Sequence, residues 1–443
     1  MLLKKIEKPD LSVISKERIN FIENNLSDIY YKNNLHKYSD EKYLYWDKIK
    51  FKEIPKELRS SEELWFVIKS MRLLNTQTII KSEYNKYFKM GKPNFLEEFL
   101  YKLDLSLRGD FFGIELSKKE KQIFFQNGII EEAISSSQIE GAMTASNQAK
   151  DMIQKDKKPM SVDEKMIMNN YIAMNFVKDE LVKEKLTKES LLELQAILTK
   201  GILKNNSESG RFRTNNDKIV IQDILTGDIY HKAPNEKFLM EELEKLINYA
   251  NDEDKGVFTH PFIKACILHF WIGYLHPFCD GNGRTARAVF YWYLLKKGYL
   301  GFSFIPISNI IKDSKTQYKN AYIYSEQDDN DLTYFLVYLA NSTKKAFKEY
   351  EKYILEKAKE KDSYDFKHLD LNERQEKLLI YFSRSPDSFT TTTSHMNYYQ
   401  VSKLTAIKDL KHLENMGILK SKKVGRFVRY FKSDAFEDIL NLK

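Results

Sequence analysis

The residues best suited to chemistry lie together in residues 276–287, which read HPFCDGNGRTAR. A Gly-Asn-Gly turn permits positive φ, so successive backbone N–H groups can point at one anion. Arg284 and Arg287 are three residues apart, so on a helix both can hold phosphate oxygens from one side. Asp280 adjoins this anionic site, where a carboxylate calls for a divalent cation such as Mg²⁺. His276 is expected to titrate near neutrality, as a base for a hydroxyl nucleophile requires. The segment therefore predicts a polyphosphate site beside a general base.

Two helices are needed to hold this loop. The segment from Pro261 to Leu275 is apolar and aromatic at helical spacing, which predicts a buried helix. A second helix is expected from Arg284 to Lys297, opened by the glycine turn and closed by Gly298. The loop then lies at the N-terminus of the second helix, where the helix dipole adds partial positive charge.

The order His-Pro-Phe-x-Asp-Gly-Asn-Gly-Arg-x-x-Arg resembles the signature of the Fic domain, and every signature position is filled. Fic proteins are mostly helical and transfer AMP from ATP to a Ser, Thr or Tyr hydroxyl of a protein, releasing pyrophosphate. The resemblance implies this activity here, with Mg²⁺ as the metal and ATP as the substrate. Related enzymes that move other groups tend to alter the Gly-Asn-Gly-Arg part of the loop. That part is intact in this chain, so AMP is the favoured group.

The resemblance also implies roles for single residues. His276 would be the general base, Phe278 would anchor the loop in the core, and Asp280 would bind Mg²⁺. Tyr318 is suggested for the adenine pocket by its position alone. The residues implied to bind ATP are Gly281, Asn282, Gly283, Arg284, Arg287 and Tyr318, and those implied to be catalytic are His276, Asn282 and Arg284.

Upstream, residues 131–142 read EEAISSSQIEGA and resemble the inhibitory helix of the family, with Ser136, Glu140 and Gly141 at the matching positions. A pair between Glu140 and Arg287 would occupy the guanidinium needed for the γ-phosphate, so we expect the enzyme to restrain itself. The alternative is an ordinary helix end that Gly141 terminates. In some relatives the same Glu is associated with removing AMP, so de-AMPylation stays open.

A hairpin is predicted between the two motifs. Ile219, Val220 and Ile221 would form one strand and residues 229–231 the other, with a turn at 226–228. In the family a hairpin flap at this place holds the target protein by strand addition. The alternative is an ordinary surface hairpin.

Composition limits the class of protein. The chain has 443 residues, of which 42% are hydrophobic and 30% charged, so it should fold into two to four domains. Its two cysteines, Cys266 and Cys279, are too few for a disulfide framework and fit a reducing cytoplasm. No apolar run suggests an export signal or a membrane span. We expect a cytoplasmic protein.

The positive charge is concentrated near the C-terminus. Net charge is +8, yet residues 396–432 alone hold nine Lys or Arg against Asp409 and Glu414. In the same region Asn372 and Ser402 can cap two helices, and the runs ILKSKKV and RFVRYF can pair as a hairpin. This order is that of a winged helix-turn-helix. One interpretation is DNA binding by helix and wing; the other is a protein-interaction or dimerisation module, so a homodimer stays open.

The predicted fold class is mainly α: a Fic-type helical domain with a short β-hairpin flap, an N-terminal helical region and a C-terminal winged helix-turn-helix of α+β type. The expected domains are residues 1–115, a Fic core at 116–345 with its inhibitory helix near 131–141, a charged linker helix at 346–371, and residues 372–443. The favoured function is a self-inhibited protein adenylyltransferase acting on an unknown target and on itself. The alternative is a DNA-binding transcriptional regulator whose Fic-like domain only binds nucleotide.

Overall fold

The computed structural model describes residues 5–107, 118–222, 227–253, 256, 258–303, 305–363, 369–384, 389–424 and 427–441. The protein is mainly helical, as predicted, with three small antiparallel sheets among these residues. None of the helices in these ranges is long and apolar enough to cross a membrane.

The N-terminal part packs around its own aromatic core. It contains α1 (Lys16–Asn24), α2 (Leu26–Lys32), α3 (Trp46–Ile49), α4 (Ser61–Leu74), β1 (Thr76–Lys81), β2 (Tyr87–Gly91) and α5 (Asn94–Leu107). Trp46, Trp65 and Ile68 are buried in this core together with Tyr334 from much later in the chain. The region predicted as mostly helical therefore also holds a hairpin, and it is fixed to the central helices rather than independent of them.

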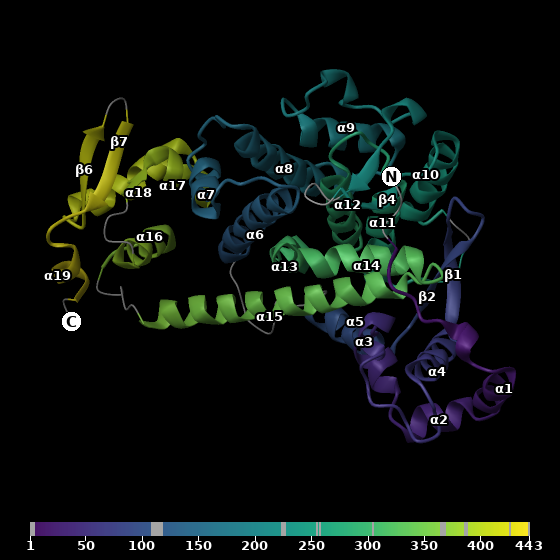
Figure 1. Ribbon diagram of the computed structural model, residues 1–443. Coiled ribbons are helices and arrows are strands. Elements are labelled where there is room, and N and C mark those ends of the chain that lie inside the picture. Colours follow the sequence, from purple (N-terminus) through teal and green to yellow (C-terminus); the bar gives the residue numbers. More distant parts are fainter. Residues whose placement is uncertain are drawn as a thin grey trace.

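The central part holds the candidate chemistry. Its elements are α6 (Lys118–Ile139), α7 (Ser146–Gln154), α8 (Val162–Asp179), α9 (Lys188–Thr199), β3 (Val220–Gln222), β4 (Ile229–Lys232), α10 (Glu236–Ala250), α11 (Pro261–Leu275), α12 (Asn282–Lys296), α13 (Ile307–Asp313), α14 (Lys315–Gln327) and α15 (Thr333–Ser363). The helices α11 and α12 are buried on nearly every side, and α12 packs against α8, α9 and α11 (Figure 1).

Local sequence explains where α11 and α12 begin and end. His260 caps α11 by accepting the Phe262 N–H, and Pro261 occupies the first helical position, where its missing N–H costs nothing. The helix ends at His276, whose φ of 47° is left-handed. Gly281, with φ of 87°, allows the chain to turn into α12. The predicted helix, loop and helix are confirmed, with α12 starting two residues earlier than expected.

The long helix α15 runs from the central part towards the C-terminus (Figure 1). The charged linker helix expected from residue 346 is the second half of α15, which begins at Thr333. The last elements are α16 (Glu373–Arg384), β5 (Phe389–Thr391), α17 (Thr392–Tyr399), α18 (Lys403–Asn415), β6 (Leu419–Val424), β7 (Phe427–Lys432) and α19 (Phe436–Asn441), with strand order β5-β7-β6. We call residues 372–443 the C-terminal module.

The C-terminal module has a core of its own and a buried charge at its centre. Leu379, Phe382 and Leu410 are among its buried apolar residues. Asp409 on α18 accepts hydrogen bonds from Arg374 on α16 and lies 3.1 Å from the Nε2 of His395 on α17. One carboxylate therefore joins three helices. The predicted cap of α18 by Ser402 is confirmed.

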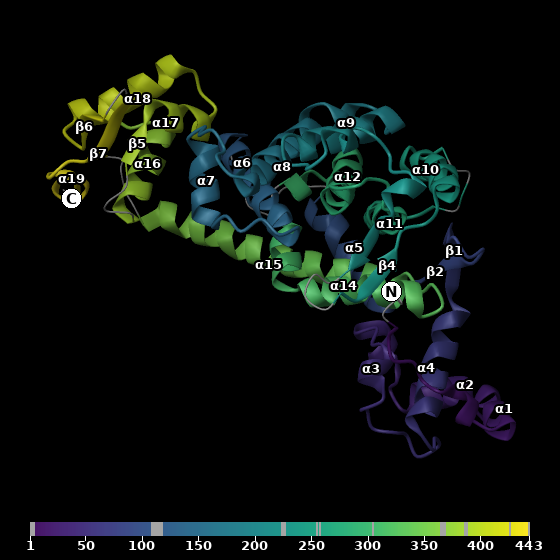
Figure 2. The same ribbon diagram turned by 45° about the horizontal axis from the view of Figure 1, so that its top comes forward.

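The C-terminal module lies beside α6 and α7, on the opposite side of the molecule from α1 and α2 (Figure 1, Figure 2). Helix α17 contacts both α6 and α7, and the Lys155 ammonium lies 4.4 Å from the ring centroid of Phe389. The helix that carries the predicted inhibitory residues is thus also a support for the C-terminal module.

Candidate active site

The loop between α11 and α12 is held from inside by Asn282. Its Oδ1 accepts the Phe278 N–H at 2.9 Å, and its Nδ2 donates to the Phe278 carbonyl at 2.8 Å. The Phe278 side chain is fully buried and stacks on Phe212, so the predicted core anchor is confirmed. The side chain of Asn282 is 3% exposed and committed to the loop. Its contribution to an anion site is therefore through the backbone and the shape of the turn, which the sequence did not reveal.

Charged groups surround the glycine turn closely. A Cβ added at Gly283 would collide with the Glu140 carboxylate and lie 3.3 Å from Arg287 Nη1, and one added at Gly281 would lie 3.9 Å from Arg284 Nη2. Both guanidinium groups therefore face the turn, as the sequence predicted. A side chain at position 283 would have to displace the Glu140 carboxylate, so glycine leaves room for these groups to approach the backbone directly.

Both guanidinium groups are buried, and among the described residues each has an N–H group that makes no hydrogen bond. Arg284 is 1% exposed and donates from Nη1 to the Leu198 carbonyl at 2.7 Å. Arg287 is 3% exposed. Within the part of the chain that the structure describes, Arg284 Nε and Arg287 Nη1 have no hydrogen-bond partner. Buried charged donors without partners are costly, so this corner is suited to an anion that would satisfy them.

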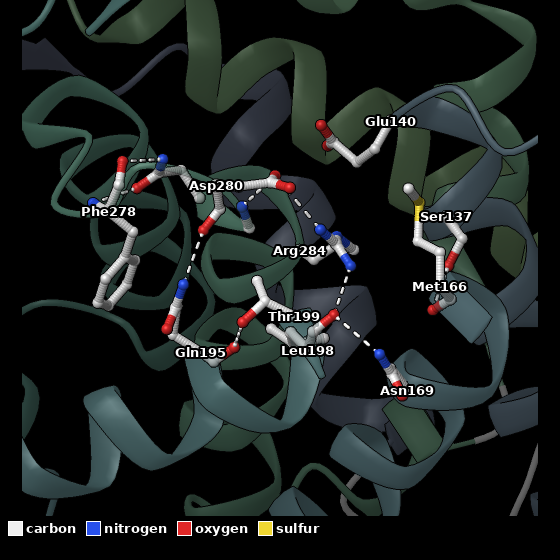
Figure 3. A network of polar contacts seen from close by, with 12 residues as sticks. Ser137, Glu140, Met166, Asn169, Gln195, Leu198, Thr199, Phe278, Asp280 and Arg284 are labelled. Carbon is white, nitrogen blue, oxygen red and sulfur yellow. Dashed lines mark hydrogen bonds and ion pairs between the residues drawn. The ribbon is translucent and has the colours of Figure 1, made fainter. Parts of the chain in front are cut away.

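Asp280 stands at the open side of the turn, with its side chain 49% exposed. Its Oδ1 accepts the Gly281 N–H and lies 3.4 Å from Arg284 Nη2. Its carbonyl accepts from Gln195 Nε2 at 3.2 Å, and Gln195 Oε1 accepts the Gly210 N–H. Figure 3 shows Gln195, Asp280, Arg284 and Leu198 in one chain of polar contacts. Gln195 is fully buried on α9, and the sequence gave no signal for it.

A carboxylate from the residue directly after α6 occupies this corner. Arg287 Nη2 donates to Glu140 Oε1 at 2.8 Å, and the same guanidinium donates to the Ser136 hydroxyl at 2.8 Å and the Ser136 carbonyl at 2.9 Å. The predicted Glu140–Arg287 pair is confirmed. Gly141 has φ of 105°, which lets the chain leave α6 directly after Glu140. Burial works to raise the pKa of Glu140, but the Arg287 guanidinium outweighs it and lowers that pKa.

His276 lies at the end of α11 with its side chain partly exposed. Its Nδ1 is 3.2 Å from the Gly273 carbonyl, which can only accept, so we assign the proton of the neutral ring to Nδ1. This leaves the Nε2 lone pair available. Burial, with a smaller contribution from the charge of His231, lowers the pKa of His276 to about 4. The sequence placed this titration near neutrality; in the structure the imidazole is instead neutral throughout the physiological range.

Arg213 supports the loop from the side, and the sequence did not identify it. It is 4% exposed, and its Nε donates to the His276 carbonyl at 2.6 Å while its Nη2 donates to the Leu275 carbonyl at 3.0 Å. Its backbone N–H donates to the Pro277 carbonyl at 2.9 Å. Arg213 is 63 residues from His276, and a buried arginine at that distance carries no local pattern from which it could be found.

The predicted hairpin is present. β3 pairs with β4 in an antiparallel register that sets Val220 opposite Lys232 and Ile221 opposite His231. Ile219 immediately precedes β3, and Thr226 of the expected turn lies outside the described residues. Val220 is 38% exposed. The strand thus offers the Val220 side chain to solvent.

Tyr318, the residue suggested for the adenine, lies in an aromatic cluster on α14. Its hydroxyl is 2.8 Å from His269 Nε2, and its ring contacts Tyr322, Phe335 and Tyr338. Burial raises its pKa to about 12, so the hydroxyl stays protonated. A role in adenine binding stays a prediction.

Part of this region is similar to known proteins. Residues 185–294 match the Fic/DOC family. Protein adenylyltransferase fic-1 of Caenorhabditis elegans is 27% identical over 143 residues, which are 32% of this chain and 25% of that protein. Protein adenylyltransferase Fic of Nematostella vectensis is 29% identical over 147 residues, 32% of this chain and 29% of that protein. The aligned part of the chain spans only about a quarter of the length of these curated relatives.

Solved structures extend the likeness in fold. A Fic-1 structure from C. elegans aligns with a TM-score of 0.52 and 17% sequence identity, covering 78% of this chain and 96% of that one. A second Fic-1 structure, of a glutamate-to-glycine variant, gives the same TM-score at 15% identity. At these identities the likeness establishes the fold, which extends well beyond residues 185–294.

Proposed function

We propose that the Fic domain of this chain, residues 185–294, transfers AMP from ATP to a Ser, Thr or Tyr hydroxyl of a protein, releases pyrophosphate, and is restrained by Glu140. One observation carries the proposal. Two buried guanidinium groups, each with an N–H donor that has no partner among the described residues, face a glycine turn at the N-terminus of α12, with a neutral imidazole on the same loop. The named adenylyltransferase relatives support the reaction class.

The triphosphate would bind at the N-terminus of α12. The backbone of Gly281, Asn282 and Gly283 would face the α- and β-phosphates, where the helix dipole also favours negative charge. Arg284 would take the β-phosphate region and Arg287 the γ-phosphate, through the N–H groups for which the described part of the chain offers no partner. In nucleotidyl transfer the protein contributes mainly alignment and charge stabilisation. The reaction rate would therefore depend on the rigid loop, which the two hydrogen bonds of Asn282 hold in shape.

His276 would remove the proton from the incoming hydroxyl. Its Nδ1–H is held by the Gly273 carbonyl, so Nε2 is the atom that accepts the proton. The lowered pKa keeps the ring unprotonated and ready at neutral pH. A base with a lowered pKa is a weaker base. More of the driving force for AMP transfer must therefore come from the stabilised pyrophosphate leaving group.

Asp280 fits a magnesium ion. Mg²⁺ commonly uses one or two carboxylates and completes its shell with substrate phosphates and water. Asp280 supplies such a carboxylate at the open side of the phosphate corner. No group of three or more His, Cys, Asp or Glu side chains able to hold a metal by themselves occurs in the described ranges. A bound Mg²⁺ would neutralise phosphate charge, and Asp280 would hold it there.

Glu140 would restrain the enzyme by occupying the place of the γ-phosphate. Its carboxylate pairs with Arg287 and lies against Gly283, so an ATP molecule must either displace it or bind with its α-phosphate misplaced. Removal of AMP from a modified target, with Glu140 orienting a water molecule, stays a prediction from the family resemblance.

Intact-protein mass spectrometry tests the proposal. The full chain with Glu140→Gly, incubated with Mg²⁺ and ATP, should gain the mass of AMP on itself, and α-labelled ATP should mark any target in an extract. His276→Ala should abolish the adduct, whereas His36→Ala in the N-terminal region should not. An adduct of another mass would contradict AMP transfer, and one that survives His276→Ala would contradict the assigned base.

The predicted target flap and the C-terminal module extend the proposal. Ile219, Val220 and Ile221 would receive a target segment by strand addition. For the C-terminal module we propose a winged helix-turn-helix, formed by α16, α17 and α18 with β6 and β7 as the wing.

DNA binding by this module would rest on exposed lysines of α18 and β6, namely Lys403, Lys408, Lys411, Lys422 and Lys423. Part of the positive charge is already engaged, because Lys420 pairs with Asp434 and Lys432 with Glu437. Of the other predicted wing residues, Arg429 lies over Phe389 and Arg426 lies outside the described residues.

Fluorescence anisotropy of a labelled duplex with the full chain tests DNA binding by the C-terminal module. Affinity should fall steeply between about 50 and 200 mM salt and with Lys408→Ala, and a salt-independent signal would contradict it. The reading of the whole chain as a regulator that only senses nucleotide is not favoured by the adenylyltransferase relatives.

A further inference from the structure

The end of α11 is held by an unusual set of donors. Four successive carbonyl oxygens, from Tyr274 to Pro277, each receive a hydrogen bond from outside the helix. Arg213, just before the flap, donates to three of them. His231, on flap strand β4, serves the fourth: its Nε2 lies 2.8 Å from the Tyr274 carbonyl. The flap is therefore tied directly to the helix end that carries the proposed base.

His231 must carry a positive charge to make its contacts. Its Nδ1 lies 2.8 Å from Glu326 Oε2 on α14, and its Nε2 faces the Tyr274 carbonyl. A carbonyl only accepts, and so does an ionised carboxylate, so both ring nitrogens must donate. A neutral imidazole has one N–H and could make one of the two bonds. His231 is 6% exposed, so water cannot replace the lost partner freely.

The surroundings agree with this charge state. Burial works to lower the pKa of His231, but the Glu326 carboxylate outweighs it and raises that pKa. The other groups facing the ring are Arg213, which opposes the charge, and the Tyr274 phenol, whose pKa burial raises so that it stays neutral. The charge on His231 in turn helps to lower the pKa of His276.

We propose that His231, held as an imidazolium by Glu326, is a positioning residue that fixes the target-binding flap against the end of α11 and so sets where an acceptor hydroxyl meets His276. This inference rests on the proposed adenylyl transfer. The pairing of β3 with β4 connects the target strand directly to His231. Ile221, on the strand that would receive the target, is directly opposite His231. His276 follows two residues after Tyr274, the residue that His231 holds.

The two bonds of His231, which we call the His231 clamp, predict the direction in which pH and removal of charge change the stability of the flap. When His231 loses a proton, one of its two bonds is lost and the flap loosens, so the flap should exchange amide hydrogens faster at high pH than intrinsic rates explain. Glu326→Gln removes the carboxylate that stabilises the cation, so the same loosening should occur near neutrality. His231→Gln keeps a donor for the Tyr274 carbonyl without the charge and should act less severely than His231→Ala.

Histidine NMR reads the charge without any assay of activity. In the full chain labelled with ¹⁵N-histidine, the ring nitrogens of His231, assigned by their loss in His231→Gln, should show an imidazolium at pH 7. An ordinary histidine, with a pKa of about 6.5, is mostly neutral at that pH. In Glu326→Gln the signal should become that of a neutral ring. A neutral His231 at pH 7 in the unmodified protein would overturn the inference.

Hydrogen exchange and self-labelling then test the consequence. Exchange of the β3 and β4 amides should be faster in Glu326→Gln than in Glu349→Gln, which removes an exposed carboxylate from α15. In the Glu140→Gly background, Glu326→Gln should slow AMP self-labelling by about tenfold or more, since a hydrogen bond to a charged group is lost, while nucleotide affinity stays unchanged. Equal exchange or equal labelling in the two variants would refute the positioning role. If no variant, including Glu140→Gly alone, accepts AMP, the proposed function fails. The NMR and exchange results still decide whether His231 holds the flap as an imidazolium.

Discussion

Replacing Glu140 by Gln should release the enzyme partly, and replacing it by Gly should release it further. Gln keeps the side-chain volume beside Gly283 but removes the charge that holds Arg287. Gly removes both the charge and the atoms that occupy the phosphate corner. The two variants thus separate electrostatic restraint from simple occupancy.

The magnitude follows from the contact. The Arg287–Glu140 bond is 2.8 Å long, with Arg287 3% and Glu140 34% exposed. A hydrogen bond to a charged partner contributes about 1.5–3 kcal/mol. Because a third of the Glu140 side chain meets solvent, we take the lower part of that range, about 1.5–2 kcal/mol. This corresponds to a roughly ten- to thirtyfold rise in the population of the competent site.

The assay is the initial rate of AMP incorporation from α-labelled ATP into the full chain. Glu140→Gln should be roughly tenfold faster than the unmodified protein, and Glu140→Gly faster again. Glu131→Gln is the matched control, because Glu131 lies on the same helix but pairs with Lys150. Arg287 keeps its bonds to Ser136 in every variant, so the release measures Glu140 alone. Rates within twofold of each other for all four proteins would refute the restraint.

Three further predictions concern the base, its support and the C-terminal module. In the Glu140→Gly protein the labelling rate should stay level as pH falls to about 5 and drop only below it, because the base must be neutral and the pKa of His276 is lowered to about 4; a half-maximal rate near pH 6.5 would contradict this. Arg213→Ala should lower the Tm by several degrees and the labelling rate together, since the carbonyls of residues 275 and 276 lose their donors at ~1–3 kcal/mol each, and Arg213→Lys should not restore either because a lysine lacks the forked donors. Asp409→Ala should destabilise the C-terminal module by about 3 kcal/mol, because it removes the shared partner of half-buried Arg374 and buried His395. Proteolysis would then cleave residues 372–443 selectively, and an unchanged digestion pattern would refute the central place of this carboxylate.

The loop and its two helices could be predicted from the sequence because their geometry is local. Residues 276–287 are contiguous, so a positive φ at Gly281 and two arginines one turn apart follow from residue type and spacing, whereas the left-handed φ of His276 does not. The Glu140–Arg287 pair was also predicted, although 147 residues separate its members. It came from the resemblance of a short motif and not from any pattern within the chain.

The support of the loop could not be predicted in the same way. Gln195, Arg213 and His231 lie on three separate segments. Gln195 and Arg213 act on backbone groups of the loop, and His231 acts on the Tyr274 carbonyl at the end of α11. A backbone carbonyl has no residue type, so nothing in the sequence marks which side chain will meet it. Asp409 shows the same limit, since in the sequence it only entered the count of charges, whereas in the structure it is buried between helices.

The sequence alone determined which groups are available: a glycine turn, an imidazole, two arginines and a carboxylate on an upstream helix. Tertiary structure decided their states. Packing of α6 against the loop gives Arg287 a partner, and burial lowers the pKa of His276. The flap supplies the charged donor that holds the end of α11. The reason is physical: chemical identity is carried by each residue, whereas charge state and partner depend on the dielectric surroundings and on atoms brought together only by folding.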